Sequence, residues 1–115
     1  MWLNRGMYGG EQILSSDVVN TFVTSKSPNS HRGLGYDKPN LAKPEWSSTC
    51  EEAGPTVFGH TGFTGTCFWV DPENDMIYIF LCNRVYPSRN NKAFTEVGAR
   101  AGIMKALYQA VERNK

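Results

Sequence analysis

One stretch of the sequence combines residue types that could do chemistry with a backbone that a ligand could reach. Residues 58–66 (FGHTGFTGT) hold three glycines, three threonines and His60, directly before the apolar run 67–70. Glycines in an extended segment remove side chains, so another backbone or a ligand can approach the strand closely. His60 and Thr61 add a titratable ring and a hydroxyl beside that bare backbone. The stretch indicates a ligand-facing strand edge; the alternative is a glycine-rich bulge with a surface histidine.

Two strands joined by a tight turn are predicted directly after this stretch. Residues 66–70 alternate, with Phe68 and Val70 on one face and Cys67 and Trp69 on the other. Pro72 suits a type I turn over 71–75. Residues 76–82 are apolar throughout. A strand that is apolar on both faces should be covered on both, which predicts helices above and below an antiparallel sheet. One cover is expected from the C-terminal helix, and the other from the N-terminal helix or from protein outside this chain.

Helices are predicted near both ends of the chain. Apolar residues at spacings of three and four predict one helix over 91–113, with a single apolar face: Phe94, Val97, Ala101, Met104, Tyr108 and Val111. Gly98 and Gly102 are expected to let this helix lie close to the sheet. Residues 1–10 predict the last turn of a helix with a glycine stop, and 17–24 a second helix capped by Ser15 or Ser16.

The middle of the chain predicts loops. Three of the six prolines fall in 38–55, which indicates a surface loop anchored by Trp46, and a short strand is expected over 33–37. His31 is expected at the surface and Cys50 as an exposed thiol. An odd number of cysteines favours free thiols. A chain that begins within a helix suggests truncation, so these elements are expected to form one partial domain. It is expected to be helical over 1–24, loop-rich over 25–56, sheet over 57–83 and helical over 91–113.

The order of these features resembles the serine β-lactamase and penicillin-binding-protein superfamily. His60-Thr61-Gly62 is similar to its third motif, Lys-Thr-Gly, or His-Thr-Gly in many class C-like esterases and carboxypeptidases. The similarity continues through the 71–75 turn, the strand over 76–83, Tyr86-Pro87 and the final helix, and it reaches back to residues 32–37 (RGLGYD). The resemblance implies an α+β fold, an antiparallel sheet flanked by helices.

The same resemblance implies roles for five residues. His60 would shape the electrostatics of the site and help to bind the carboxylate of a substrate. Thr61 would hydrogen-bond that carboxylate, Gly62 would keep the strand bare for substrate, and Thr64 would contact substrate. The backbone N–H of Phe63 would form half of an oxyanion hole, whose donors face the charge that develops in the transition state. The resemblance implies no metal and no cofactor.

The motif that carries the nucleophile in this superfamily, Ser-x-x-Lys, does not occur in the sequence, and neither does Tyr-x-Asn. Both would lie upstream, so the chain is expected to be the C-terminal part of an enzyme and inactive alone. Two hypotheses stay open. The first is a periplasmic or extracellular serine hydrolase, acylated on an upstream serine by a β-lactam, D-alanyl peptide or ester. The second is a non-catalytic module that keeps the fold and binds a peptide or partner.

Composition and charge argue against two classes of partner. A formal net charge of +1 argues against nucleic acid, which needs a concentrated basic face. The longest apolar run, 76–82, has seven residues, whereas a membrane-spanning helix needs about 20.

We expect the chain alone to self-associate. In the superfamily that it resembles, two N-terminal strands pair with the strand that matches 76–83, so their absence would leave an open apolar edge, which is a template for another copy. Light scattering at micromolar concentration should give a mass above the 12.9 kDa of one chain. A monodisperse monomer that unfolds cooperatively would contradict this expectation.

Overall fold

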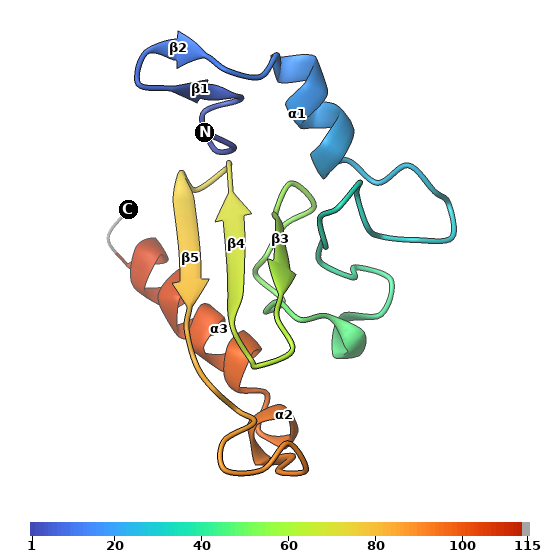
Figure 1. Ribbon diagram of the computed structural model, residues 1–115, viewed down its shortest axis with the longest axis vertical. Helices are drawn as coiled ribbons and strands as arrows, with labels where there is room; N and C mark the ends of the chain where they lie inside the picture. Colours follow the sequence, from blue (N-terminus) through green and yellow to red (C-terminus); the bar gives the residue numbers. More distant parts are fainter. Residues whose placement is uncertain (114–115) are drawn as a thin grey trace.

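The computed structural model describes residues 1–113, in which a three-stranded antiparallel sheet carries a helix on one face (Figure 1). The strands are β3 (Phe58–Thr61), β4 (Cys67–Asp71) and β5 (Met76–Phe80), in the order β3-β4-β5. Helix α3 (Ala99–Glu112) lies behind them, and the N-terminal segment lies beyond one end of the sheet. The predicted α+β class, an antiparallel sheet with helical cover, is confirmed.

The covered face of the sheet packs against α3. Trp69 and Tyr78 project from β4 and β5, and Met104 and Tyr108 from α3; all four are at most 6% exposed. Cys50, expected as an exposed thiol, is buried in the same cluster, and burial raises the pKa of its thiol to about 11. The three cysteines are free, as predicted. Apolar contact beneath the sheet, not local composition, decides the burial of Cys50.

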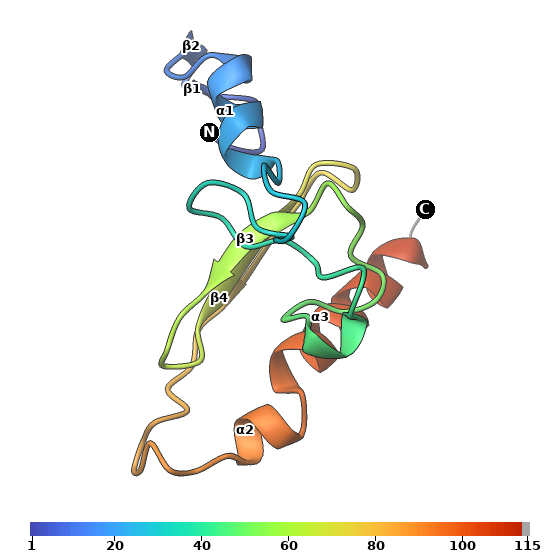
Figure 2. The ribbon, with the colours of Figure 1, turned by 90° about the vertical axis from the view of Figure 1, so that its right-hand side faces the viewer.

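The opposite face of the sheet has no helix on it among residues 1–113, as Figure 2 shows with the sheet near edge-on. Ile77 and Ile79 of β5 are 53% and 63% exposed, and Phe68 of β4 is also exposed. Residues 1–113 therefore supply a helix to one face, and the N-terminal helix does not provide the second cover. The apolar side chains that prompted the prediction of a second cover form an open surface instead.

The predicted C-terminal helix is two helices. α2 (Ala93–Glu96) ends before Gly98, which adopts the left-handed conformation with φ 61°, and α3 begins at the next residue. This break turns Val97 outward, where it is 75% exposed, although the apolar spacing placed it on the buried face. A Cβ on Gly102 would meet nothing within 4 Å, so close packing on the sheet does not explain that glycine.

The N-terminal segment is a small unit of its own. Residues 1–6 form one turn whose hydrogen bonds, Gly6 N–H to Met1 O and Arg5 N–H to Trp2 O, match the end of a helix. Arg5, not a glycine, takes the left-handed position with φ 49°. A hairpin of β1 (Met7–Tyr8) and β2 (Glu11–Gln12) follows, so the helical prediction for 1–10 holds only for the first turn. Ser15 then caps α1 (Ser16–Val23), accepting from Val18 N–H.

The loop-rich middle differs from its prediction at two points. Residues 33–37 do not form a strand; only Asp37 pairs with β3, through two backbone hydrogen bonds to Gly59. Trp46, at the end of the 3₁₀ turn Pro44–Trp46, is 72% exposed and lies beneath the Lys43 ammonium, so it does not anchor the loop. No helix within residues 1–113 is long and apolar enough to cross a bilayer.

A buried carboxylate ties α3 to the turn between β4 and β5. Tyr108 Oη donates to Asp71 Oδ2 at 2.5 Å, and Asn74 donates to the same oxygen at 2.8 Å. Burial alone would raise the pKa of Asp71, but these hydrogen bonds and those from the backbone N–H groups of Asn74 and Glu73 outweigh it and lower the pKa. Asp71 therefore stabilises the fold in its charged form.

Tyr108→Phe should lower the free energy of unfolding at pH 7 by roughly 1.5–3 kcal/mol, because a hydrogen bond to a buried charge is lost. The folded pKa of Asp71 lies below its unfolded value of about 3.9, so this stabilisation is complete above that pH and is lost as pH falls through the folded pKa. Urea unfolding at several pH values measures both effects. Tyr86→Phe, at a tyrosine that is 77% exposed, is the control, and an equal loss there would contradict the account.

Candidate active site

The glycine in β3 allows the strand to lie tightly against β4. Gly59 is paired with Trp69, and a Cβ added there would contact the carbonyl oxygen of Phe68 and lie 2.8 Å from Trp69 Cε3. No side chain fits in that space. Because side chains alternate along a strand, Gly59 on the covered face places His60 on the open face, directly opposite Phe68.

His60 is held at both ring nitrogens. Nδ1 lies 2.8 Å from the carbonyl oxygen of Thr61, and Nε2 lies 3.0 Å from Nη2 of Arg32. A carbonyl can only accept a hydrogen bond and a guanidinium can only donate one. The two contacts are therefore satisfied together by a neutral ring that carries its proton on Nδ1.

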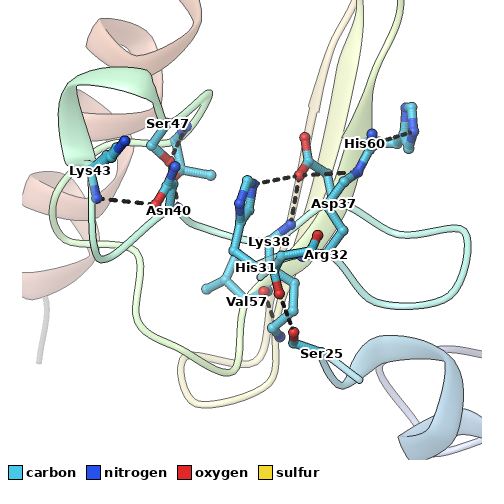
Figure 3. A network of polar contacts seen from close by, with 12 residues as sticks. Ser25, His31, Arg32, Asp37, Lys38, Asn40, Lys43, Ser47, Val57 and His60 are labelled. Atoms are coloured by element: carbon cyan, nitrogen blue, oxygen red, sulfur yellow. Dashed lines mark hydrogen bonds and ion pairs between the residues drawn. The ribbon is translucent and has the colours of Figure 1, made fainter. Parts of the chain in front are cut away.

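Arg32 belongs to a polar network that the sequence did not predict (Figure 3). Its Nε lies 3.6 Å from Asp37 Oδ1, and His31 Nε2 lies 3.1 Å from the same oxygen. His31 is exposed, as predicted, and its ring also pairs with a carboxylate. Asp37 is itself held by its backbone pairing to Gly59 in β3. The network fixes a half-exposed guanidinium beside His60.

The turn after β3 brings an unused donor next to this histidine. Gly62 N–H donates to Thr66 O at 2.7 Å and Gly65 N–H donates to Gly62 O at 3.0 Å, which closes the turn, with Gly65 at φ 106°. A Cβ on Gly65 would lie 2.5 Å from Cys82 Sγ. Within residues 1–113 the N–H of Phe63 donates to no protein acceptor. It is free to bind an oxygen of a ligand.

The predicted site residues gather around one hollow but do not all line it. His60, Thr61 and Gly62 line a shallow depression of about 510 Å³, together with Phe68, Ile79 and Leu81. Phe63 and Thr64 lie in the adjoining turn, and Thr64 accepts from the backbone N–H of Arg84 at 2.8 Å. The exposed ring of Phe63 lies beneath the guanidinium of Arg84, 4.8 Å away.

A second hollow of about 500 Å³ lies on the other side of His60. It shares His60 and Phe68 with the first and is otherwise apolar: Trp2, Leu14, Val18, Phe22, Leu34, Gly35 and Tyr36. Tyr36 packs edge-on against Trp2, Phe58 and Phe68, which joins the N-terminal unit to the open face of the sheet. The sequence did not predict this aromatic wall, since its members come from four separate segments.

Chemically, the arrangement offers a neutral imidazole, a hydroxyl, a cation and a free backbone donor beside apolar surface. These groups suit binding an anionic ligand and stabilising an oxyanion, as opposed to holding a metal. Among residues 1–113, no group of three His, Cys, Asp or Glu side chains could hold a metal ion.

Comparison with known proteins gives one family and several relatives. The Beta-lactamase family model matches residues 3–101. Relatives from Escherichia coli O157:H7 and K12, both named "Putative D-alanyl-D-alanine carboxypeptidase", are 34% and 33% identical over 96% of this chain and 27% of their own length. An N-acetylmuramyl-L-alanine amidase of Bacillus subtilis is 24% identical over the same shares. The chain thus spans about a quarter of the curated relatives that it matches. No solved structure matches significantly.

The two histidines should show opposite tautomers in their neutral forms. His60 should carry its proton on Nδ1, whereas His31, whose Nε2 faces the Asp37 carboxylate, should carry it on Nε2. Long-range ¹H–¹⁵N spectra of the imidazole rings distinguish the two forms. Arg32→Met should move His60 toward the Nε2–H form. If the spectra show His60 already in that form in the unsubstituted protein, the contact with Arg32 is wrong.

Proposed function

Because this chain belongs to the beta-lactamase family, we propose that it forms the C-terminal part of a serine hydrolase, to which it supplies the His-Thr-Gly strand and half of the oxyanion hole. The observation that carries the proposal is the free N–H of Phe63 in the turn that follows His60 and Thr61. A backbone donor aimed at an oxygen that becomes negative is the usual means of stabilising a tetrahedral intermediate.

In this proposal a segment outside the chain supplies the nucleophile. The serine Oγ attacks the substrate carbonyl carbon and gives its proton to a base of that segment. The carbonyl oxygen becomes an oxyanion held by Phe63 N–H and by the serine's own N–H. Collapse expels the leaving group, which takes up the proton, and water later hydrolyses the acyl-enzyme. The open sheet face, with Phe68, Ile77 and Ile79 exposed, is where that segment would pack.

We propose a peptide that ends in D-alanine as the substrate. Its terminal carboxylate would accept a hydrogen bond from the Thr61 hydroxyl and would be attracted by the Arg32 guanidinium, 3.0 Å from His60. The positive charge that attracts the carboxylate would come from Arg32, because a neutral His60 carries none, whereas the Lys of the usual motif is charged. The names of the Escherichia coli relatives favour the same substrate over a β-lactam or a simple ester.

Because a substrate of this kind is part of the bacterial cell wall, we propose that the whole protein acts in the periplasm or outside the cell.

The test uses the longer protein that we propose contains this chain, with the 115-residue chain as the negative control. A fluorescent penicillin should label the longer protein on one serine, identified by mass spectrometry, and D-alanine should be released from a D-alanyl-D-alanine peptide. The short chain should give background rates only. No serine adduct and no release by the longer protein would leave the alternative, a non-catalytic binding module. Ester hydrolysis without D-alanine release would overturn the proposed substrate.

His60→Ala in the longer protein should lower kcat/KM by about one to three orders of magnitude without loss of folding, because an exposed residue facing a hollow contributes little to packing. Steady-state kinetics and thermal unfolding measure the two effects. Lys105→Ala, on the helix behind the sheet, is the control and should leave kcat/KM unchanged. Normal turnover by His60→Ala on every substrate would show that His60 is structural.

A further inference from the structure

One side chain reaches from α3 to the turn that holds the free donor. Arg100, in the first turn of α3, donates from Nε to the carbonyl oxygen of Gly65 at 2.8 Å and from Nη2 to that of Gly62 at 2.9 Å. These partners are 35 and 38 residues away in sequence. The guanidinium is partly buried and lies 5.4 Å from the centre of the Phe94 ring. A planar fork that spans two carbonyls is a geometry that arginine provides and lysine does not.

Through Gly62, Arg100 hydrogen-bonds the peptide group whose N–H would bind the oxyanion. The carbonyl of Gly62 and the N–H of Phe63 belong to one planar, trans peptide group, so they point in opposite directions. The carbonyl of Gly62 accepts from Arg100, which lies on α3 behind the sheet, and so points toward that helix. The N–H of Phe63 is thereby directed away from α3.

The same contact changes the strength of that donor. A cation that hydrogen-bonds a carbonyl polarises the peptide group, and linked hydrogen bonds strengthen one another. Gly62 O accepts from Gly65 N–H as well as from Arg100, so two hydrogen bonds together fix the direction of this carbonyl. The arginine supplies the positive charge, and its hydrogen bond is one of the two that hold the carbonyl in place.

Resting on the proposed function, we infer that Arg100 is a positioning residue of the oxyanion hole: by holding the Gly62 carbonyl, it orients and polarises the N–H of Phe63. It does not touch substrate in this role. A merely structural role, tying α3 to the turn, would cost stability but would leave the transition state of the folded enzyme unaffected.

The test compares Arg100→Met, Arg100→Lys and Lys105→Met in the longer protein. Lys105 is the matched control, since it lies on the same helix and, within residues 1–113, forms its ion pair with Glu52, at 3.5 Å, and not with the turn after β3. Arg100→Met should lower kcat about tenfold or more with KM within about threefold, because the donor acts chiefly in the transition state. Binding of a boronic acid that mimics the tetrahedral intermediate should weaken by a similar factor. Arg100→Lys should recover part of the loss, and Lys105→Met should behave as the unsubstituted protein.

Two further measurements separate an effect on the folded enzyme from a loss of folding. Thermal unfolding selects a temperature at which every variant is folded, and the ¹³C shift of the Gly62 carbonyl and the ¹⁵N shift of Phe63 should move in Arg100→Met but not in Lys105→Met. Unchanged kcat and boronate affinity in a folded Arg100→Met variant of an active enzyme would overturn the inference alone. An unsubstituted protein that forms no acyl-enzyme would overturn the proposed function, and the catalytic role of Arg100 with it.

Discussion

The site depends on the tight pairing of β3 with β4. Gly59 opposite Trp69 leaves no room for a side chain, and this close approach fixes the register in which His60 faces Phe68 and Thr61 faces Cys67. A shift of one residue would turn His60 into the core and place Gly59 on the open face. The glycine therefore does more than keep the strand bare, because it decides which face of the sheet receives the imidazole.

The two faces of the sheet then serve different ends. Behind it, Trp69, Met104 and Tyr108 pack without solvent, and the Asp71 carboxylate joins α3 to the β4–β5 turn. In front, His60 stands among exposed apolar side chains between two hollows that share Phe68. Arg100 links the two sides, since it begins on the rear helix and ends on carbonyls of the turn that carries the Phe63 donor. The packed helix behind the sheet thus helps to orient the Phe63 N–H in front of it.

Sequence patterns predicted the parts of the structure that local chemistry controls. Alternation located β4, a continuous apolar run located β5 and a proline located their turn. The cap of α1 was narrowed to Ser15 or Ser16, of which Ser15 is the cap, because capping depends only on the next three residues. The break at Gly98 was missed, because a left-handed glycine interrupts a helix without disturbing its apolar spacing.

The contacts that complete the site were also missed, for a different reason. Arg32 reaches His60 across 28 residues and Arg100 reaches Gly62 across 38, and nothing in either local sequence marks a partner so far away. The burial of Cys50 likewise depends on a helix that begins about fifty positions later. The residues of a local motif can be recognised in the sequence. The groups that contact them come from distant parts of the chain, and the sequence alone does not identify them.

A crystal structure of the longer protein bound to a boronic acid transition-state analogue tests the role of the Phe63 N–H most directly. If the N–H of Phe63 belongs to the oxyanion hole, a boronate oxygen should lie roughly 2.7–3.1 Å from the backbone nitrogen of Phe63, the distance of an oxyanion-hole hydrogen bond. Arg100 should remain on the carbonyl of Gly62, and the boron should be bonded to a serine from outside residues 1–115. A boronate whose oxygens are held elsewhere, with the N–H of Phe63 still unpaired, would contradict the account.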